Sequence, residues 1–179
     1  ARVPSGGAPE VQAAIARARA AQPRWAAMPF AERARALRRL AGRLARDPEV
    51  VATIMRESGK PRFEAQAMEV LYTCELTRFA TGRAGRRAVR DGIRHPFLMA
   101  TKRARVVRHP HGVVGVIGPW NWPLLNNYAD AIAPLAMGNA VVLKPSPVTP
   151  MTSLLVARLW REEGLPEDVF QVVVGGAEA

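Results

Sequence analysis

The chain has 179 residues, 49% of them hydrophobic, which suffices for one ordinary core and a second small unit. Its 26 basic and 15 acidic residues give a net charge of +11, but all except three of the basic residues precede residue 109. Most are arginines in alanine-rich helical sequence with no aromatic platform between them. We therefore favour a solvated basic surface and predict no nucleic-acid binding.

Membrane and secretory signals are not found in the sequence. No stretch approaches the roughly 20 uninterrupted apolar residues of a membrane span, and none shows the charged-then-apolar pattern of a leader. The one cysteine, Cys74, excludes an internal disulfide and fits a reducing compartment. We therefore expect a cytoplasmic protein that binds no membrane.

The first half of the chain predicts amphipathic helices. Pro9-Glu10 suits a first helical turn, and apolar residues follow it at helical spacing. Between residues 31 and 47, Leu37, Leu40 and Leu44 form an apolar stripe, and arginines cover the other faces. Such a stripe is typical of a helix that packs on a core and needs no ligand to explain it.

Two more helices are expected in the same half. Asp47-Pro48 predicts an N-cap and a first helical position, and Gly59 predicts a C-terminal stop. The next helix is expected from residue 61 to about residue 80. Trp25, just past the first helix, is expected in the core. The residues of the later helix predicted to face partly inward are Phe63, Val70, Leu71 and Cys74.

Residues 82–112 are basic and irregular, and we expect a connector or a small peripheral sheet. One short extended piece is predicted at residues 105–108, and His109-Pro110-His111-Gly112 predicts a turn. These histidines and His95 have no cysteines or carboxylates at ligand spacing beside them. We therefore expect exposed loop histidines and no metal site.

After residue 112 the pattern changes to alternating strands and helices. The predicted strands are residues 113–117, 140–143 and 169–174. The predicted helices are residues 123–137, ended by Gly138, and a helix capped by Thr149-Pro150 that reaches about residue 163. Short links in this β-α-β-α-β order indicate a parallel sheet with right-handed crossovers. We predict an α/β fold in which residues 1–111 are a helical region with a connector and residues 112–179 an incomplete Rossmann-like unit.

Two unusual segments fall at one edge of this sheet. Ligands of parallel sheets bind at the carboxyl ends of the strands, where residues 118–123 (GPWNWP) and 144–150 (KPSPVTP) lie. Asn121 comes just before a helix, where asparagine is a good N-cap. A side-chain amide at a helix start also stabilises a developing oxyanion without titrating. Position alone does not decide between these two roles.

Three other candidate sites carry weaker signals. Lys144, with Ser146 close behind it, is either a solvated strand end or a ligand of ribose hydroxyls or a phosphate, and no Gly-x-Gly-x-x-Gly fingerprint supports a dinucleotide. The segment 57–61 (ESGKP) lacks the first glycine and the hydroxyl residue of a phosphate-binding loop. Cys74 lies in an apolar helical stripe without a nearby base, so we expect packing and not nucleophilic chemistry.

Several segments together resemble the aldehyde dehydrogenase superfamily. GVVGVIGPWNWPLL, APLAMGNAVVLKPSPVTP and GLPEDVFQVVVGG follow one another at the family's spacing. ESGKPRFEA resembles its upstream helical marker, and RARAAQPRWAAMPFAERARAL resembles its opening helices. The resemblance covers nearly the whole chain, and the Pro-Trp-Asn-aromatic-Pro and Gly-Asn-x-Val-x-x-Lys-Pro segments together are highly specific.

The resemblance implies oxidation of an aldehyde to an acid, or to an acyl thioester in some members, with hydride passed to NAD or NADP. In the family, a cysteine thiolate attacks the aldehyde, and a backbone N–H and the asparagine that Asn121 matches hold the oxyanion. The implied partners are a small-molecule aldehyde and, in a full-length enzyme, further copies of the chain. Trp122 and Asn126 match substrate-tunnel positions. The implied cofactor contacts are Ile117, Gly118, Pro119 and Trp120, with Lys144 and Ser146 at the adenosine ribose.

Two features depart from the family pattern. Pro147 stands where many members have a glutamate that accepts both ribose hydroxyls, so NADP is supported as well as NAD. The family is well over twice as long, and its nucleophilic cysteine and general-base glutamate have no match here. We therefore expect an N-terminal piece of such an enzyme, inactive alone and with an open sheet edge. A non-catalytic binding or assembly module derived from an enzyme is the alternative.

Overall fold

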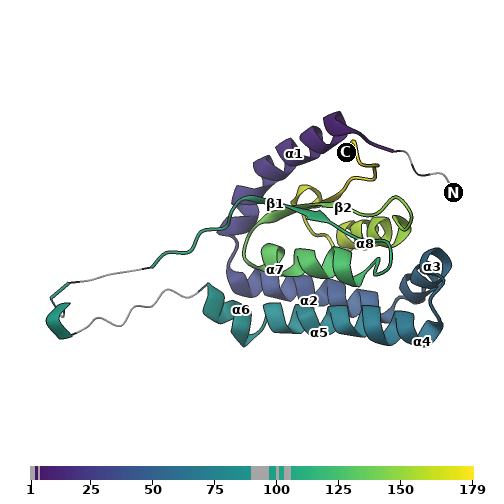
Figure 1. The fold of residues 1–179 in the computed structure, drawn as a ribbon. Coiled ribbons are helices and arrows are strands. Elements are labelled where there is room, and N and C mark those ends of the chain that lie inside the picture. The colour runs from purple at the N-terminus through teal and green to yellow at the C-terminus, as the bar shows by residue number, and fades with distance from the viewer. Residues whose placement is uncertain (1–2, 4, 90–96, 100, 103–105) are drawn as a thin grey trace.

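Three parallel strands run through the middle of the molecule, with helices on both faces (Figure 1). The computed structural model describes residues 3, 5–89, 97–99, 101–102 and 106–179. The strands, hydrogen-bonded in sequence order, are β1 (Val113–Ile117), β2 (Ala140–Lys144) and β3 (Phe170–Val172). The predicted α/β fold, a helical region followed by a parallel sheet, is confirmed.

Helices form most of the remaining structure. The α-helices are α1 (Ala8–Ala27), α2 (Phe30–Arg46), α3 (Pro48–Ser58), α4 (Arg62–Glu64), α5 (Tyr72–Ala80), α6 (Arg83–Ala88), α7 (Asp130–Ala136) and α8 (Met151–Glu162). The π-helices are η1 (Ala65–Leu71), which joins α4 to α5, and η3 (Leu125–Ala129), which leads into α7. The short 3-10 helices are η2 (Phe97–Met99) and η4 (Glu167–Val169). None of the helices within these described ranges is long and apolar enough to span a bilayer.

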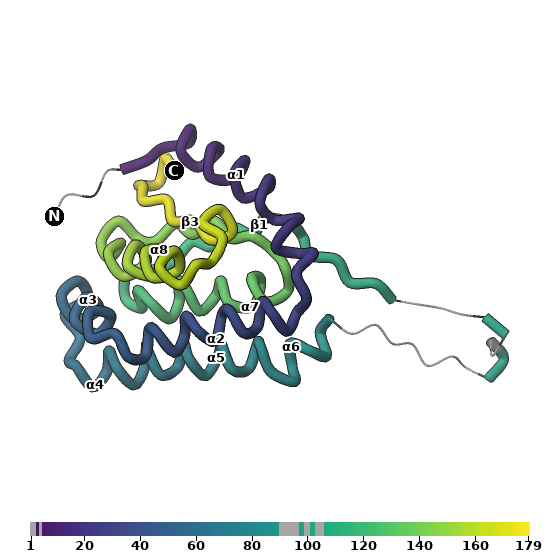
Figure 2. The backbone as a smooth tube through the Cα atoms, turned by 180° about the vertical axis from the view of Figure 1, so that it is seen from behind, coloured from purple at the N-terminus to yellow at the C-terminus, as the bar shows by residue number. Residues whose placement is uncertain are grey.

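The molecule is layered around the sheet. Both crossovers advance in the same direction, so α7 and α8 cover one face of the sheet while α1 covers the other (Figures 1 and 2). The long helices α2 and α5 lie beyond α7 and form an outer layer on that side. Gly6, before α1, donates a 2.7 Å backbone hydrogen bond to Val174, so the N-terminal segment also lies beside the end of β3.

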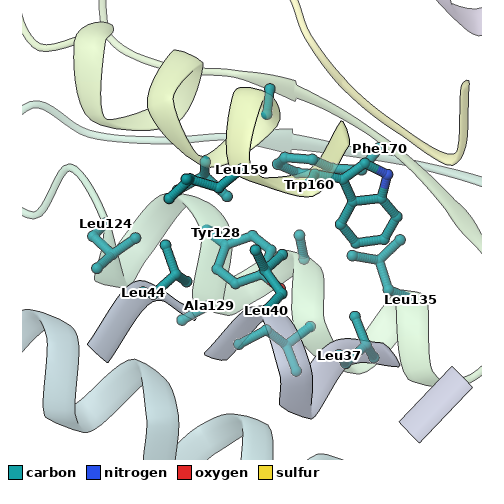
Figure 3. Close-up of a cluster of buried hydrophobic side chains, with 14 of the residues drawn as sticks. Leu37, Leu40, Leu44, Leu124, Tyr128, Ala129, Leu135, Leu159, Trp160 and Phe170 are labelled. Atoms are coloured by element: carbon teal, nitrogen blue, oxygen red, sulfur yellow. The ribbon is translucent and has the colours of Figure 1, made fainter. Parts of the chain in front are cut away.

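The main core lies between the sheet and α2. Leu37, Leu40 and Leu44 are buried on α2, as the stripe predicts, and they face side chains of η3, α7 and α8 (Figure 3). Trp25 is also buried, but it lies inside the last turn of α1 and not past the helix as expected. Its indole Nε1 donates a 2.8 Å hydrogen bond to the Leu135 carbonyl, which satisfies the one polar atom of that ring.

The run α4–η1–α5 corresponds to the helix expected at residues 61–80. Val70 is buried as predicted, whereas Phe63 and Leu71 are 81% and 58% exposed, so the prediction that they face inward is wrong. The inward stripe of this run consists of small and polar residues, which hydrophobicity does not identify. These residues are Ala65, Glu69, Thr73 and Thr77.

The core contains residues from both sides of position 112, such as Leu40 and Leu135. The division of the chain at that position stays a prediction. Residues 106–108 form no strand, and Arg105, the first residue of the piece expected to be extended, lies outside the described residues. His95, considered above as a metal ligand, also lies outside them.

Candidate functional site

The three strands end side by side at one edge of the sheet. Ile117 at the end of β1 pairs with Lys144 at the end of β2, and the Gly118 N–H donates a 3.0 Å hydrogen bond to the Lys144 carbonyl. The Lys144 ammonium donates to the Gly175 carbonyl, 3.1 Å away, in the turn after β3. The fold therefore brings the two unusual segments together, as the parallel topology predicts.

A hydroxyl joins the loop after β1 to the loop before α8. The Thr149 Oγ1 donates a 3.0 Å hydrogen bond to the Trp120 carbonyl. Thr149 was predicted to cap α8, and that prediction is wrong. The first N–H groups of α8, from Met151 and Thr152, instead donate to the Glu57 carboxylate at 2.8 and 2.9 Å.

Gly118 is required by packing inside the protein. The buried Asn127 amide donates from Nδ2 to the Pro123 carbonyl at 2.8 Å. Its Oδ1 lies against Gly118, where an added Cβ would come within 1.2 Å of that oxygen. Any other residue at position 118 would displace the Asn127 amide and disturb its hydrogen bond to the Pro123 carbonyl.

Asn121 does not cap the following helix. The cap position of η3 is Leu124, and the N–H groups of Leu124 and Leu125 donate to Oε2 of Glu69, at 2.8 and 3.2 Å. The Asn121 side chain is exposed, and no hydrogen bond from it is found within the part of the chain that the structure describes. The N-cap interpretation of Asn121 is therefore wrong, and its amide is free to donate outward.

Large apolar side chains are exposed at the end of β1 and in the loop that carries Asn121. Ile117 is 80% exposed and Trp120 is 58% exposed, although both are large apolar residues. Trp122 and Asn126 are partly buried, and the Asn126 N–H donates a 3.1 Å hydrogen bond to the Trp122 carbonyl. Exposed apolar side chains beside a free amide suit contact with flat, partly apolar ligands.

Two polar side chains at the end of β2 keep donors free. The Lys144 ammonium has three donors, and one of them is used by Gly175. The Ser146 Oγ accepts a 3.2 Å hydrogen bond from the Val148 N–H, which leaves its hydroxyl hydrogen free to donate. Together they provide one cationic and one neutral donor group at this edge of the sheet.

Three charged residues that the sequence did not assign to the site contact the segments that form it. Glu57 and Glu69 bind the starts of α8 and η3, and the Lys60 ammonium lies 2.6 Å from Glu69 Oε1 and 3.4 Å from the centroid of the Trp122 ring. Burial raises the pKa of the Glu57 carboxyl, opposed by the hydrogen bonds from α8. A charged residue on the inward stripe of a helix, as at Glu69, is the signal that a partner is buried with it.

Cys74 lies in α5 and not at the sheet edge. Its Sγ lies 3.4 Å from the Ala41 carbonyl, and burial together with the nearby Glu75 raises the pKa of the thiol. A raised pKa keeps the thiol neutral. A neutral thiol suits packing, whereas a nucleophile needs the thiolate form. Over the described ranges, no group of three or more histidine, cysteine, aspartate or glutamate side chains is placed to bind a metal ion.

A three-stranded parallel sheet, covered on both faces and carrying unusual loops at its carboxyl edge, defines the class of α/β proteins with an edge-bound ligand site. The family model named "Aldehyde dehydrogenase family" matches residues 1–179, and the chain belongs to that family.

Individual relatives agree with this assignment. N-succinylglutamate 5-semialdehyde dehydrogenase 1 of Caulobacter vibrioides is 42% identical over 173 residues, covering 94% of this chain and 35% of that protein. A crystal structure of an E. coli NADP dependent enzyme superposes with a TM-score of 0.90 at 35% identity, covering 99% of this chain and 36% of the other. An NAD-dependent benzaldehyde dehydrogenase from Corynebacterium glutamicum gives a TM-score of 0.81 at 37% identity, covering 96% and 38%. The chain thus spans about a third of the length of the curated relatives it matches, and it corresponds to their N-terminal part.

Proposed function

We propose that the protein containing this chain oxidises a small-molecule aldehyde to a carboxylic acid, with NAD or NADP as the hydride acceptor, as a homo-oligomer. Membership of the aldehyde dehydrogenase family supports the reaction class. The observation that carries the proposal is the exposed Asn121 amide, which stands at the carboxyl edge of the sheet with its donors free among the described residues. A free, directional N–H donor is what a developing oxyanion needs.

The chemistry divides between this chain and residues outside it. A cysteine thiolate from beyond residues 1–179 adds to the aldehyde carbon, the C=O π electrons move to oxygen, and Asn121 donates an N–H to that oxyanion. The nicotinamide cofactor supplies the acceptor for the hydride that leaves the same carbon. Water then hydrolyses the enzyme thioester, which releases the acid, the thiolate and one proton to solvent. Cys74 takes no part, because it lies in α5 with a raised pKa.

The remaining residues bind and orient. In the proposal, Trp122 and Asn126 line the aldehyde's path. Pro147 offers no carboxylate to repel a 2′-phosphate, which is compatible with either cofactor. Relatives of both kinds, NAD-dependent and NADP-dependent, have the same fold. The residues proposed to contact the cofactor are Ile117, Gly118, Pro119 and Trp120, with Lys144 and Ser146 at the adenosine ribose.

The test uses the longest reading frame that contains residues 1–179, called here the whole protein. Asn121→Ala is expected to lower kcat for aldehyde oxidation by on the order of 10²-fold, because one oxyanion donor is lost. Gln12→Ala removes an exposed amide from α1 and is the matched control, with kcat expected at the parental value. A parental kcat in Asn121→Ala would contradict the role of Asn121, and a whole protein without aldehyde oxidation would contradict the proposed reaction.

A further inference from the structure

The first turn of η3 is held by a carboxylate from a distant helix. Glu69 of η1 accepts two backbone hydrogen bonds at Oε2, from Leu124 at 2.8 Å and from Leu125 at 3.2 Å, and its side chain is fully buried. The positive end of a helix attracts an anion, and here that anion is internal. The start of η3 is therefore closed to phosphates, and Glu69 fixes where the loop after β1 ends.

Lys60 connects the same carboxylate to the loop itself. Its Nζ lies 2.6 Å from Glu69 Oε1 and 3.4 Å from the centroid of the Trp122 ring. The Lys60 side chain is 10% exposed, so both attractions act largely away from bulk water, where they are stronger. The Lys60 ammonium thus contacts both the ring of Trp122 and Glu69, the carboxylate that binds the start of η3.

Asn121 stands between two anchored neighbours. The carbonyl of Trp120 accepts a 3.0 Å hydrogen bond from Thr149, and the ring of Trp122 is held by Lys60. Asn121 is itself exposed, and its side chain has no hydrogen bond to any described residue. The position of its Cα and Cβ, from which the amide extends, is therefore set by the anchored residues on either side and not by contacts of its own.

We infer that Lys60 and Glu69 are positioning residues, which hold the backbone around Asn121 so that its amide reaches the reacting carbonyl oxygen. The inference rests on the proposed function, in which Asn121 donates to the oxyanion. Such a donor works only at hydrogen-bond distance, and a misplacement of about 1 Å costs on the order of 10²-fold in rate. Glu69 is buried and the Lys60 side chain is only 10% exposed, so they act through Trp122 and the first turn of η3.

Lys60→Met in the whole protein removes the ammonium and keeps an unbranched side chain. We expect kcat to fall about tenfold or more and the cofactor KM to change by less than about twofold, because the groups at the ribose are untouched. Lys60→Arg keeps a cation for both Glu69 and the ring and is expected within about threefold of the parental kcat. Glu64→Gln is the matched control, since Glu64 lies 3.9 Å from the same ammonium with its side chain 39% exposed, and its kcat is expected to be parental.

The decisive measurement combines Lys60→Met with Asn121→Ala. If Lys60 acts through Asn121, Lys60→Met costs about tenfold or more in the parent but less than about twofold once Asn121 is alanine. Equal factors in the two backgrounds overturn the inference and leave the role of Asn121 intact. An Asn121→Ala protein with parental kcat removes the proposed role of Asn121 and this inference with it.

Glu69→Asp provides the same test if Lys60→Met does not fold. The variant keeps the buried charge and shortens its reach by one methylene, so the carboxylate no longer spans Lys60 and the N–H groups of η3 together. We expect kcat to fall about fivefold or more in the parent and to be unchanged in the Asn121→Ala background. A fall of the same size in both backgrounds assigns Glu69 a purely structural role and overturns the inference.

Discussion

The two crossover helices start at the same edge of the sheet, and both starts are bound by carboxylates from the N-terminal helical region. Glu69 binds the first turn of η3, and Glu57 binds the first turn of α8. Glu69 is fully buried and pairs with Lys60. Glu57 is partly buried, and no lysine or arginine of the described residues forms an ion pair with it.

The difference shows how burial decides what a helix-capping carboxylate needs. Removing an ionised carboxylate from water is costly, and the backbone N–H groups of one helix turn offset only part of that cost. Glu69 therefore comes with a cation, whereas Glu57 keeps some contact with water. Burial raises the pKa of the Glu57 carboxyl. The helix start whose carboxylate pairs with a cation is that of η3, close in sequence to Asn121. A fixed geometry matters there for the proposed chemistry.

Removing Glu69 is expected to have the largest effect on stability. Glu69→Ala leaves the Lys60 ammonium buried without its carboxylate and frees two N–H groups of η3, so the free energy of unfolding should fall by about 3 to 5 kcal/mol. Urea denaturation of the whole protein measures the loss. Glu64→Ala removes a partly exposed carboxylate near the same lysine and should cost less than about 1 kcal/mol. Equal losses in the two variants would refute the idea that Glu69 is the required partner.

The hydrogen bond from Thr149 to Trp120 should contribute less to the free energy of unfolding than Glu69 does. Thr149→Val keeps the shape of the side chain but removes the hydrogen bond to the Trp120 carbonyl, at an expected cost of about 1 kcal/mol. Thr73→Val is the matched control, because its buried hydroxyl oxygen has no partner among the described residues. Denaturation midpoints should therefore fall for Thr149→Val and stay level or rise for Thr73→Val. A drop in the control as large as that of Thr149→Val would show that the link to Trp120 is not the cause.

The sequence predicted most of the fold because the relevant signals are local. The leucine stripe of α2, the Asp47-Pro48 cap and the stop at Gly59 each depend on residues within a few positions, and the structure has all three. The strand–helix alternation after residue 112 likewise predicted the parallel sheet. The inward face of η1 and α5 was missed because a polar stripe that includes Glu69 and Thr73 has no hydrophobic period.

The position of the candidate site could be predicted from the sequence, but the residues that hold its loops in place could not. Parallel topology was enough to bring Asn121 and Lys144 to one edge. The capping predictions for Asn121 and Thr149 failed because the N–H groups of both helix starts bind carboxylates more than 50 residues away in the chain, at Glu69 and Glu57. No local pattern specifies such a partner, since it depends on how α3 packs against α8 and η1 against η3. The family resemblance implied a donor role for Asn121 but gave no indication of the residues that hold the backbone around it.

Glu57, the carboxylate at the start of α8, should contribute to the pH dependence of stability. Burial raises the folded-state pKa of Glu57 above its ordinary value of 4.5, so the folded protein retains a proton that the unfolded chain releases first. The free energy of unfolding contributed by Glu57 must then fall as pH rises from about 4.5 through the raised pKa. Denaturation of Glu57→Gln across this range should lack that fall.

Glu10 provides a control of opposite sign. Its exposed carboxylate accepts a 2.7 Å hydrogen bond from the Gly7 N–H at the start of α1, and that bond lowers its pKa. Its stabilising contribution is therefore present above the ordinary value and lost as pH falls through the lowered pKa. The stability difference between parent and variant should shrink with rising pH for Glu57→Gln and grow for Glu10→Gln. Slopes of the same sign would mean that burial does not separate these two carboxylates, and the contrast between a buried cap and an exposed one would be lost.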